Sequence, residues 1–338
     1  MDYQVIWFIL IAVLFIGYFV LEGFDFGVGI LMPFVSKDDI DRRIVINTIG
    51  PFWDANEVWL ITAGGAMFAA FPHWYATLFS GFYIPFFLMV VALILRAAGF
   101  EFRSKMPQRS WRRTFDQFIF WGSLLPAFLW GVAFTNIVQG LPIGADMNFT
   151  GSLIAILNPY ALLGGLVVVL VFVLHGALFL SLRTTGELKA RVEKIARLMW
   201  IPIGAITALF TILGYWQTML FEGLGLVPGT LPTLAILSFI ATYVFMRYQM
   251  QAYAFGAIAF TIVLGAAVVF SGLFPNVMPS SIDPANNLTV YNASSSRLTL
   301  QIMSIVALLF VPVVLAYQGW SYYVFSKRIS RDAIPREQ

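Results

Sequence analysis

The chain contains few of the residues that hold metals and redox groups. Its 338 residues include no cysteine and only two histidines. The absence of cysteine excludes disulfides, iron–sulfur clusters and thiolate metal sites. Charged residues are also scarce, at 11% of the chain, which is far below their share in a soluble domain. The composition therefore excludes a soluble protein built around a thiolate-bound redox centre.

Apolar residues are abundant, since 60% of the chain is hydrophobic and 33 residues are phenylalanine. A run of about 20 apolar residues is long enough to cross a bilayer as a helix. We predict an all-α, polytopic membrane protein with about nine transmembrane helices, as two four-helix bundles plus one peripheral helix. The chain is then a single integral membrane domain, 1–338. The predicted helices lie near residues 5–34, 52–71, 76–100, 116–140, 159–181, 198–221, 231–248, 252–274 and 299–326.

The connections between these helices alternate in charge. Of the 20 Lys and Arg residues, 18 fall in odd-numbered connections or the C-terminal tail, while Arg297 lies in an even-numbered connection and Arg96 in a helix. Basic connections of a membrane protein face the cytoplasm. We therefore predict that the N-terminus lies outside and the C-terminus in the cytoplasm. The net charge of +3 is then explained by basic loops facing anionic membrane lipid, and we expect no nucleic-acid partner.

Two connections are expected to be ordered. Residues 184–197 have the pattern of a short amphipathic helix on the cytoplasmic surface. Residues 275–298 are rich in Pro, Ser and Asn and are the longest outer connection, which we expect to form a cap.

Four acids lie within or beside the first two apolar runs. Glu22 and Asp25 are three residues apart and share a helix face, as do Asp54 and Glu57. A charged side chain at the centre of a membrane helix costs roughly 2.5–3.5 kcal/mol, and such groups usually mark proton or ion paths. With the predicted topology both pairs lie in the cytoplasmic half, so we predict a proton-uptake route. The alternative is an interfacial cluster at a helix start, which suits Asp54 and Glu57 but not Asp25.

Arg96 ends the third apolar run, near the same inner surface. It either extends to the lipid headgroups or pairs with one of the four acids and holds it ionised. The sequence leaves both alternatives open.

Glycines recur beside the acids, in Gly23-Phe-Asp-Phe-Gly27-Val-Gly29. No strand precedes this segment and no Lys-Ser/Thr follows it, so we do not expect a phosphate-binding loop. Gly23 and Gly27 form a small-xxx-small step that allows a neighbouring helix to approach closely. We predict the same role for Gly64 and Gly65.

The two histidines do not form a haem site. His73 follows Pro72 in a short outer turn, whereas His175 lies in the fifth predicted helix, where it could ligate haem iron. Two axial histidines need matched depth on neighbouring helices, and nothing singles out a methionine as the second ligand. We predict no metal and no haem bound directly to this chain.

Several blocks resemble subunit II of the cytochrome bd-type quinol oxidases. The most specific is PFWDANEVWLITAGGAMFAAFP at 51–72. Further blocks are GFDFGVG at 23–29, Gly81-Phe-Tyr, the 96–105 stretch ending in Phe-Arg-Ser-Lys, GVAFTNIVQGLP at 131–142, RTTGEL at 183–188 and FPNVMPSS at 274–281. The resemblance covers nearly the whole chain.

This resemblance implies a heterodimer with subunit I in the bacterial cytoplasmic (inner) membrane. Subunit I would carry two b-type haems, one d-type haem and the quinol-binding loop. Subunit II would support assembly and haem retention and supply part of the proton path, here Asp25 and Asp54. A structural quinone in this chain and a small accessory subunit remain open, as do the type of quinone and the route of O2.

Two functions from different classes fit the residues alone. The first is the non-haem subunit of a respiratory quinol:O2 oxidoreductase that takes up cytoplasmic protons for water formation without pumping. The second is a proton-coupled secondary transporter, which would also have intramembrane acids and no redox ligands. Transporters often show interrupted helices at matched positions of two repeats. Only the first helix here looks irregular, which favours the oxidase.

Overall fold

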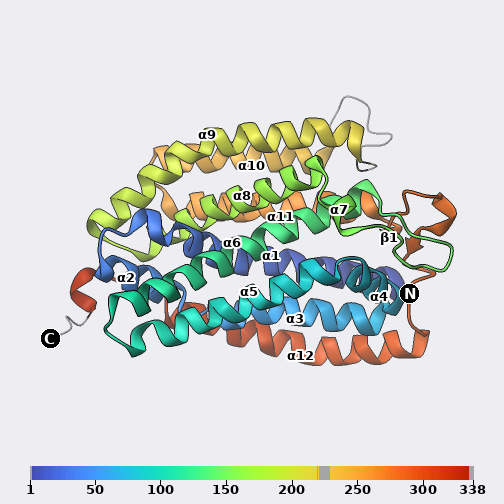
Figure 1. Ribbon diagram of the computed structural model, residues 1–338, viewed down its shortest axis with the longest axis horizontal. Coiled ribbons are helices and arrows are strands. Elements are labelled where there is room, and N and C mark those ends of the chain that lie inside the picture. Colours follow the sequence, from blue (N-terminus) through green and yellow to red (C-terminus); the bar gives the residue numbers. More distant parts are fainter. Residues whose placement is uncertain (1, 219, 221–228, 335–338) are drawn as a thin grey trace.

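The protein is an elongated bundle of long helices that run side by side along its longest axis (Figure 1). This computed structural model describes residues 2–218, 220 and 229–334. Within them, eight helices are long and apolar enough to cross a membrane. The prediction of an all-α polytopic membrane protein is confirmed, whereas the count of nine spans is not.

The helices follow the chain in the order of the predicted runs. The shorter elements are α2 (Asp39–Ile49), α4 (Pro72–Gly81), α7 (Leu153–Ile156) and the strands β1 (Asn276–Met278) and β2 (Leu288–Thr289). The long helices are α1 (Tyr3–Val35), α3 (Trp53–Ala70), α5 (Tyr83–Phe102), α6 (Arg109–Gln139), α8 (Pro159–Arg183), α9 (Gly186–Gln217), α10 (Thr230–Arg247), α11 (Gln251–Leu273) and α12 (Arg297–Val324). Among the described residues, three one-turn 3-10 segments are short additions to these, namely Arg103–Lys105, Pro284–Asn286 and Arg331–Ala333.

Some boundaries differ from the sequence-based ranges for identifiable reasons. Pro72 begins α4, and Pro85, which has no N–H to donate, lies in the first turn of α5 just after the interruption at Phe82. The segment predicted as a separate amphipathic helix is the first part of α9. The last residues of the run predicted near 198–221, namely 219 and 221, lie outside the described residues.

α3 occupies the place of the second predicted span but is not among the eight candidates. Asp54, Asn56 and Glu57 lie in its first turns, and their polarity lowers the mean hydropathy of its 18 residues. The helix nevertheless runs beside α1, α4 and α12.

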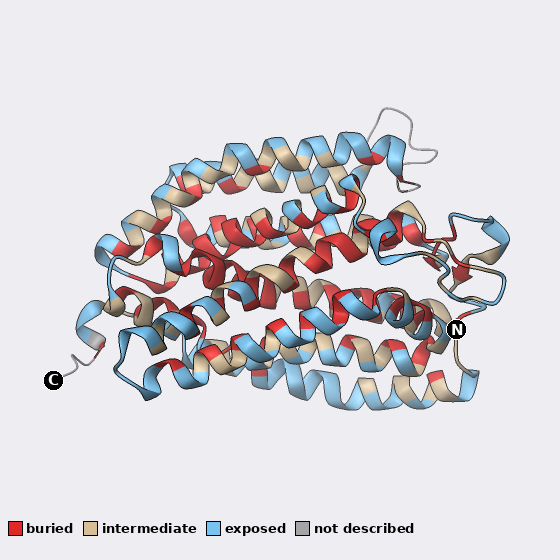
Figure 2. Cartoon of the chain, in the orientation of Figure 1, coloured by how far each residue is buried: buried red, intermediate tan, exposed pale blue. Residues whose placement is uncertain are grey.

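α1 lies at the centre of the bundle, in contact with α3, α6, α8 and α11. The close approach of α1 and α8 depends on glycine. A Cβ on Gly27 would lie 1.8 Å from the carbonyl oxygen of Phe172, and a Cβ on Gly23 would meet the ring of the same residue. The predicted packing role of Gly23 and Gly27 is confirmed. Figure 2 shows that the buried residues concentrate on these inner helices, while α12 is mostly exposed.

The prediction for Gly64 and Gly65 is wrong within this chain. A Cβ on either residue would meet no atom within 4 Å. Both lie on α3, whose outward side no other described helix of the chain covers at this position.

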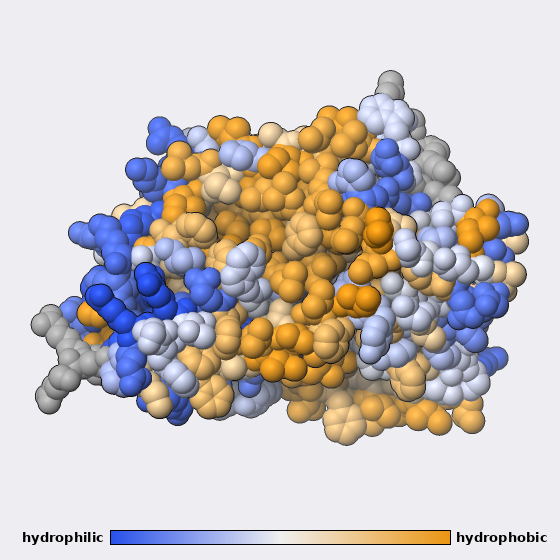
Figure 3. Space-filling model, in the orientation of Figure 1, coloured by the Kyte–Doolittle hydropathy of each residue, from blue (hydrophilic) through white to orange (hydrophobic). Residues whose placement is uncertain are grey.

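The two ends of the bundle differ. The hairpin end carries the N-terminus and the 275–298 connection, in which β1 and β2 pair antiparallel. Ser295 N–H donates to the Ala70 carbonyl and Leu141 N–H to the Pro279 carbonyl, so this connection is the ordered cap that we predicted. The basic end carries α2 and the C-terminal tail. Figure 3 shows an apolar band between hydrophilic residues at both ends, as expected for a chain that spans a bilayer.

Candidate functional site

An ion pair lies at the centre of the bundle, within the apolar band. Glu22 of α1 and Arg96 of α5 form it, and both side chains are fully buried. The Arg96 guanidinium also lies 4.8 Å from the ring centroid of Phe26 and 5.3 Å from that of Phe100. Arg96 therefore points into the protein and not to the lipid headgroups, and the aromatic faces add to the stabilisation of its charge.

Asp25 is fully buried one turn further along α1. Its Oδ2 accepts a hydrogen bond of 2.7 Å from Nδ2 of Asn56 on α3. The Oδ1 of Asn56 accepts from Tyr322 Oη at 2.8 Å and from Gln318 Nε2 at 3.2 Å. The side chain of Asp25 is thus connected to α12, the last helix of the bundle.

The two acids of α3 lie at different depths. The Oε1 of Glu57 is 3.6 Å from Arg96 Nη1, and the side chain is 18% exposed. Asp54 is exposed in the first turn of α3. We name Glu22, Asp25, Glu57 and Arg96 the core cluster. The structure brings these four residues together and places Asp54 outside the cluster, one turn closer to the basic end.

The core cluster has more acids than cations. Three carboxyl groups surround the single guanidinium of Arg96. Several buried polar atoms of the cluster and of the adjacent α1 and α6 have no hydrogen-bond partner among the described residues. They are Glu22 Oε2, Asp25 Oδ1, Glu57 Oε1, Arg96 Nε and Nη2, Tyr18 Oη and Trp130 Nε1. Buried polar groups in native proteins are rarely left without partners, so these atoms distinguish the cluster from a closed structural ion pair.

Sequence reasoning missed Asn56, Gln318 and Tyr322. Asn56 lies between Asp54 and Glu57 in the sequence. Its amide does not titrate, so a search for intramembrane acids passes over it. Gln318 and Tyr322 are four residues apart in α12, and so lie on one face. That spacing is the signal by which they could have been found.

His175 packs against α1 and α11 in the core. Its Nε2 contacts the Val20 carbonyl oxygen at 2.9 Å, and its ring is stacked on Phe255 with centroids 4.7 Å apart. The ring is therefore held against α1 and α11 by one hydrogen bond and one stacking contact. Within the described residues, no group of three or more His, Asp or Glu could hold a metal ion.

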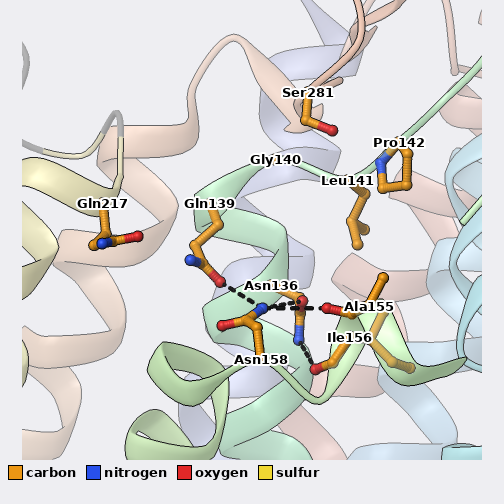
Figure 4. A pocket seen from close by; sticks show the side chains of 10 residues that line it. All are labelled: Asn136, Gln139, Gly140, Leu141, Pro142, Ala155, Ile156, Asn158, Gln217 and Ser281. Atoms are coloured by element: carbon orange, nitrogen blue, oxygen red, sulfur yellow. Dashed lines mark hydrogen bonds between the residues drawn. The ribbon is translucent and has the colours of Figure 1, made fainter. Parts of the chain in front are cut away.

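A cavity of about 420 Å³ lies near the hairpin end, where α6, α7 and α8 meet. Figure 4 shows amide side chains gathered at its wall. Asn158 Nδ2 donates to Asn136 Oδ1 and Gln139 Oε1, and Asn136 donates to the Ile156 carbonyl. None of its described lining residues is titratable, and the amides mainly join α6 to the start of α8. The candidate functional site is therefore the core cluster.

A second group of ion pairs ties the basic end together. The Asp39 carboxylate accepts from Arg103 and Arg112, and the Asp116 carboxylate from Arg103 and Arg42. Arg191 and Arg331 each pair with Asp41, whose side chain is 1% exposed, and Arg331 also pairs with Asp38. We name this group the basic-end network. It consists of Asp38, Asp39, Asp41, Asp116, Arg42, Arg103, Arg112, Arg191 and Arg331.

Asp38 lies in the connection between α1 and α2, outside the apolar band. The hydrogen bond from Arg331 holds the pKa of this carboxyl below its usual value, although partial burial acts in the opposite direction. The C-terminal segment is thereby tied to the start of α2. Ile329 N–H adds a hydrogen bond of 2.7 Å to the Arg183 carbonyl.

Fold and site together define a multi-pass helical membrane protein with a buried, acid-rich cluster. Comparison with known proteins gives the family. A family model described as cytochrome bd terminal oxidase subunit II matches residues 3–325. The chain belongs to this family, and is therefore a subunit of a terminal oxidase complex of the bacterial inner membrane.

Individual relatives agree. Cytochrome bd ubiquinol oxidase subunit 2 of Bacillus subtilis is 47% identical over 326 residues, which cover 96% of each chain. Cytochrome bd-I ubiquinol oxidase subunit 2 of Escherichia coli K12 is 37% identical over 371 residues, covering 99% of this chain and 98% of the relative. The solved structure of the bd oxidase from Geobacillus thermodenitrificans shares the fold, with a TM-score of 0.75 over 97% of this chain at 19% identity. The family assignment does not favour the transporter alternative.

Proposed function

We propose that this chain is the haem-free subunit II of a bd-type quinol:O2 oxidoreductase and conducts cytoplasmic protons toward the site where O2 is reduced to water. Its partner is subunit I, which would hold two b-type haems and the d-type haem, and this chain would support assembly and haem retention there. The observation that carries the proposal is the core cluster, in which two fully buried carboxyl groups and one partly exposed carboxyl group lie around one arginine.

The charge imbalance is what makes the cluster suitable for proton transfer. One guanidinium can compensate one carboxylate, and each further ionised acid in a low-dielectric environment carries a large desolvation penalty. The cluster therefore favours a state in which at least one acid holds a proton. Acids that hold protons and lie in contact can pass them on, which is the chemistry that general acid–base catalysis uses.

The proposed path begins at the basic end. Asp54 is exposed there, Glu57 is one turn deeper and partly exposed, and Glu22 and Asp25 are fully buried. The positive-inside rule makes the basic end cytoplasmic, with the N-terminus outside. The order of exposure then follows the direction of proton uptake.

The outward face of α3 supplies the surface for subunit I. Beyond Asp54, its exposed residues recur every three or four positions and include a glycine. They are Val58, Ile61, Thr62, Gly65 and Phe68. The neighbouring α12 is also almost wholly exposed. Small residues at a helix face allow a second membrane helix to approach closely.

Asp25→Asn tests the proton path. Asn keeps the size of the side chain but cannot carry a proton, so turnover per haem d should fall by about tenfold or more, while haem d per complex stays near the wild-type value. Quinol oxidase assays and absorbance spectra of the purified two-subunit complex measure both quantities. Asp25→Glu should restore most of the turnover. Unchanged turnover per haem in Asp25→Asn would remove Asp25 from the path.

Gly65→Leu tests the partner face. A leucine on α3 would obstruct the close approach of a partner helix, so we expect several-fold less subunit I to co-purify with the variant. Gly256→Leu on α11 is the matched control, because a Cβ there also meets no atom within 4 Å. Equal co-purification of subunit I with both variants would show that the α3 face is not the interface.

A further inference from the structure

The Asn56 side chain uses its whole hydrogen-bonding capacity. It is fully buried. Its Nδ2 donates to Asp25 Oδ2 and, at 3.3 Å, to the Leu21 carbonyl. Its Oδ1 accepts from Gln318 and Tyr322. A buried amide with two donors and two acceptor sites, all occupied, is held in one orientation.

The direction of these bonds is set by a residue that does not touch Asp25. Trp59 Nε1 donates to Gln318 Oε1 at 2.9 Å, and an indole N–H can only donate. Gln318 must then present its Nε2 to Asn56, so Asn56 must present its oxygen to Gln318 and its Nδ2 to Asp25. The indole N–H of Trp59, which can only donate, thus determines that Asn56 turns its NH2 group toward Asp25.

We infer that Asn56 is a positioning residue of the proton path, which reserves Oδ2 of Asp25 as an acceptor and directs the transferable proton to Oδ1. Oδ1 is the oxygen without a hydrogen-bond partner among the described residues. Trp59, Gln318 and Tyr322 act through Asn56 by holding the direction of its amide. This inference rests on the proposed function and specifies how its central acid is oriented.

The charged and titratable groups that interact with Asp25 come from four helices. They are Glu22 on α1, Glu57 on α3, Arg96 on α5 and Tyr322 on α12. His175 on α8 bonds to the neighbouring turn of α1 through the Val20 carbonyl. A variant that tests the inference must therefore leave these groups in place.

Two variants of the purified two-subunit complex meet this condition. Asn56→Asp keeps an acceptor for Gln318 and Tyr322 but replaces the donor to Asp25 by an oxygen. Trp59→Phe removes the donor that sets the direction, without any change of charge and without contact to Asp25. Thr242→Val is the control, because it removes a buried hydroxyl on α10 that bonds only within its own helix.

The readouts are the pH dependence of turnover per haem d and the infrared C=O band of protonated Asp25, assigned by its loss in Asp25→Asn. A hydrogen bond to a carboxylate favours the ionised form. Asn56→Asp should move the midpoint of the pH profile by about one unit to higher pH and shift the band. Trp59→Phe should do the same by about half a unit, and Thr242→Val should do neither.

The outcomes distinguish a failure of the proposed proton path from a failure of the positioning role of Asn56. If Asp25→Asn keeps full turnover, the proposed function itself is wrong. If Asp25→Asn loses turnover but neither variant moves the midpoint or the band, the path stands and the positioning role is overturned. If Asn56→Asp fails to assemble, Trp59→Phe decides alone, since a shifted band supports the inference and an unchanged band refutes it.

Discussion

At the basic end, every carboxylate oxygen of Asp39, Asp41 and Asp116 accepts a hydrogen bond from an arginine. In the core cluster, Glu22, Asp25 and Glu57 share Arg96, and one oxygen of each has no hydrogen-bond partner among the described residues. Both groups join helices that are distant in sequence. They differ in the ratio of acids to cations and in their position relative to the apolar band.

The comparison separates two uses of ion pairs in one membrane protein. At the basic end, arginines donate to the aspartate oxygens, and these pairs fix α2, α6, α9 and the C-terminal segment relative to one another. In the core cluster, where acids outnumber cations, we propose that full ionisation is too costly and that protons are bound. We expect substitutions in the basic-end network to change stability, and those in the core cluster to change turnover as well.

The largest effect is expected for Arg96→Leu. It leaves the buried Glu22 and Asp25 and the partly exposed Glu57 without a cation, and removal of one partner of a buried pair typically costs about 3–5 kcal/mol. Much less assembled complex should survive mild heating, as measured by the haem that stays bound. The double variant Arg96→Leu/Glu22→Leu should recover part of the loss, because it also removes the acid that pairs directly with Arg96. A single variant as stable as the double one would contradict the pairing described here.

Asp41→Asn should have an intermediate effect. The substitution weakens the bonds to Arg191 and Arg331, and hydrogen bonds to charged groups contribute about 1.5–3 kcal/mol each. Because both arginines remain partly exposed, water can offset part of the loss. Thermal unfolding of the complex should begin at a lower temperature, with turnover per haem d unchanged below that temperature. A drop in turnover at full stability would place the basic-end network in the proton path.

The smallest effect is expected for the pair of Asp38 with Arg331. Because Arg331 lowers the pKa of Asp38, the pair stabilises the folded state at pH values above the ordinary Asp pKa of about 4. That contribution is lost as the pH falls through the lowered value. Asp38→Asn should therefore reduce the protection of the C-terminal segment from proteolysis at neutral pH, and the difference from wild type should disappear in acid. A difference that persists in acid would indicate a cause other than charge.

The sequence predicted the helical class, the apolar runs and the four acids because these depend on local composition and on three- and four-residue spacing. It placed Glu22 and Asp25 on one face, and both are buried together. It could not choose between the two alternatives for Arg96, because a long side chain at the end of an apolar run can point to lipid or to protein. The outcome depended on Phe26, Phe100 and Glu22, which come from two helices.

Gly27 and Gly65 also differ in a way that the sequence could not predict. Both lie in small-residue steps of apolar helices, and the sequence predicted close packing for both. Only the tertiary structure shows that Gly27 meets α8 while Gly65 faces away from every described helix of the chain. A small residue allows close approach but does not specify which helix approaches, or whether that helix belongs to the same chain.

What the sequence determined by itself is the membrane architecture and the presence of acids where lipid would not tolerate them, since hydropathy and charge are properties of each segment. What only the tertiary structure decided is which acid pairs with Arg96, that Asp54 stays outside the cluster, and that Asn56 connects Asp25 to α12. These contacts join residues as far apart as 56 and 322. Their geometry is set by the packing of whole helices, and no local pattern records it.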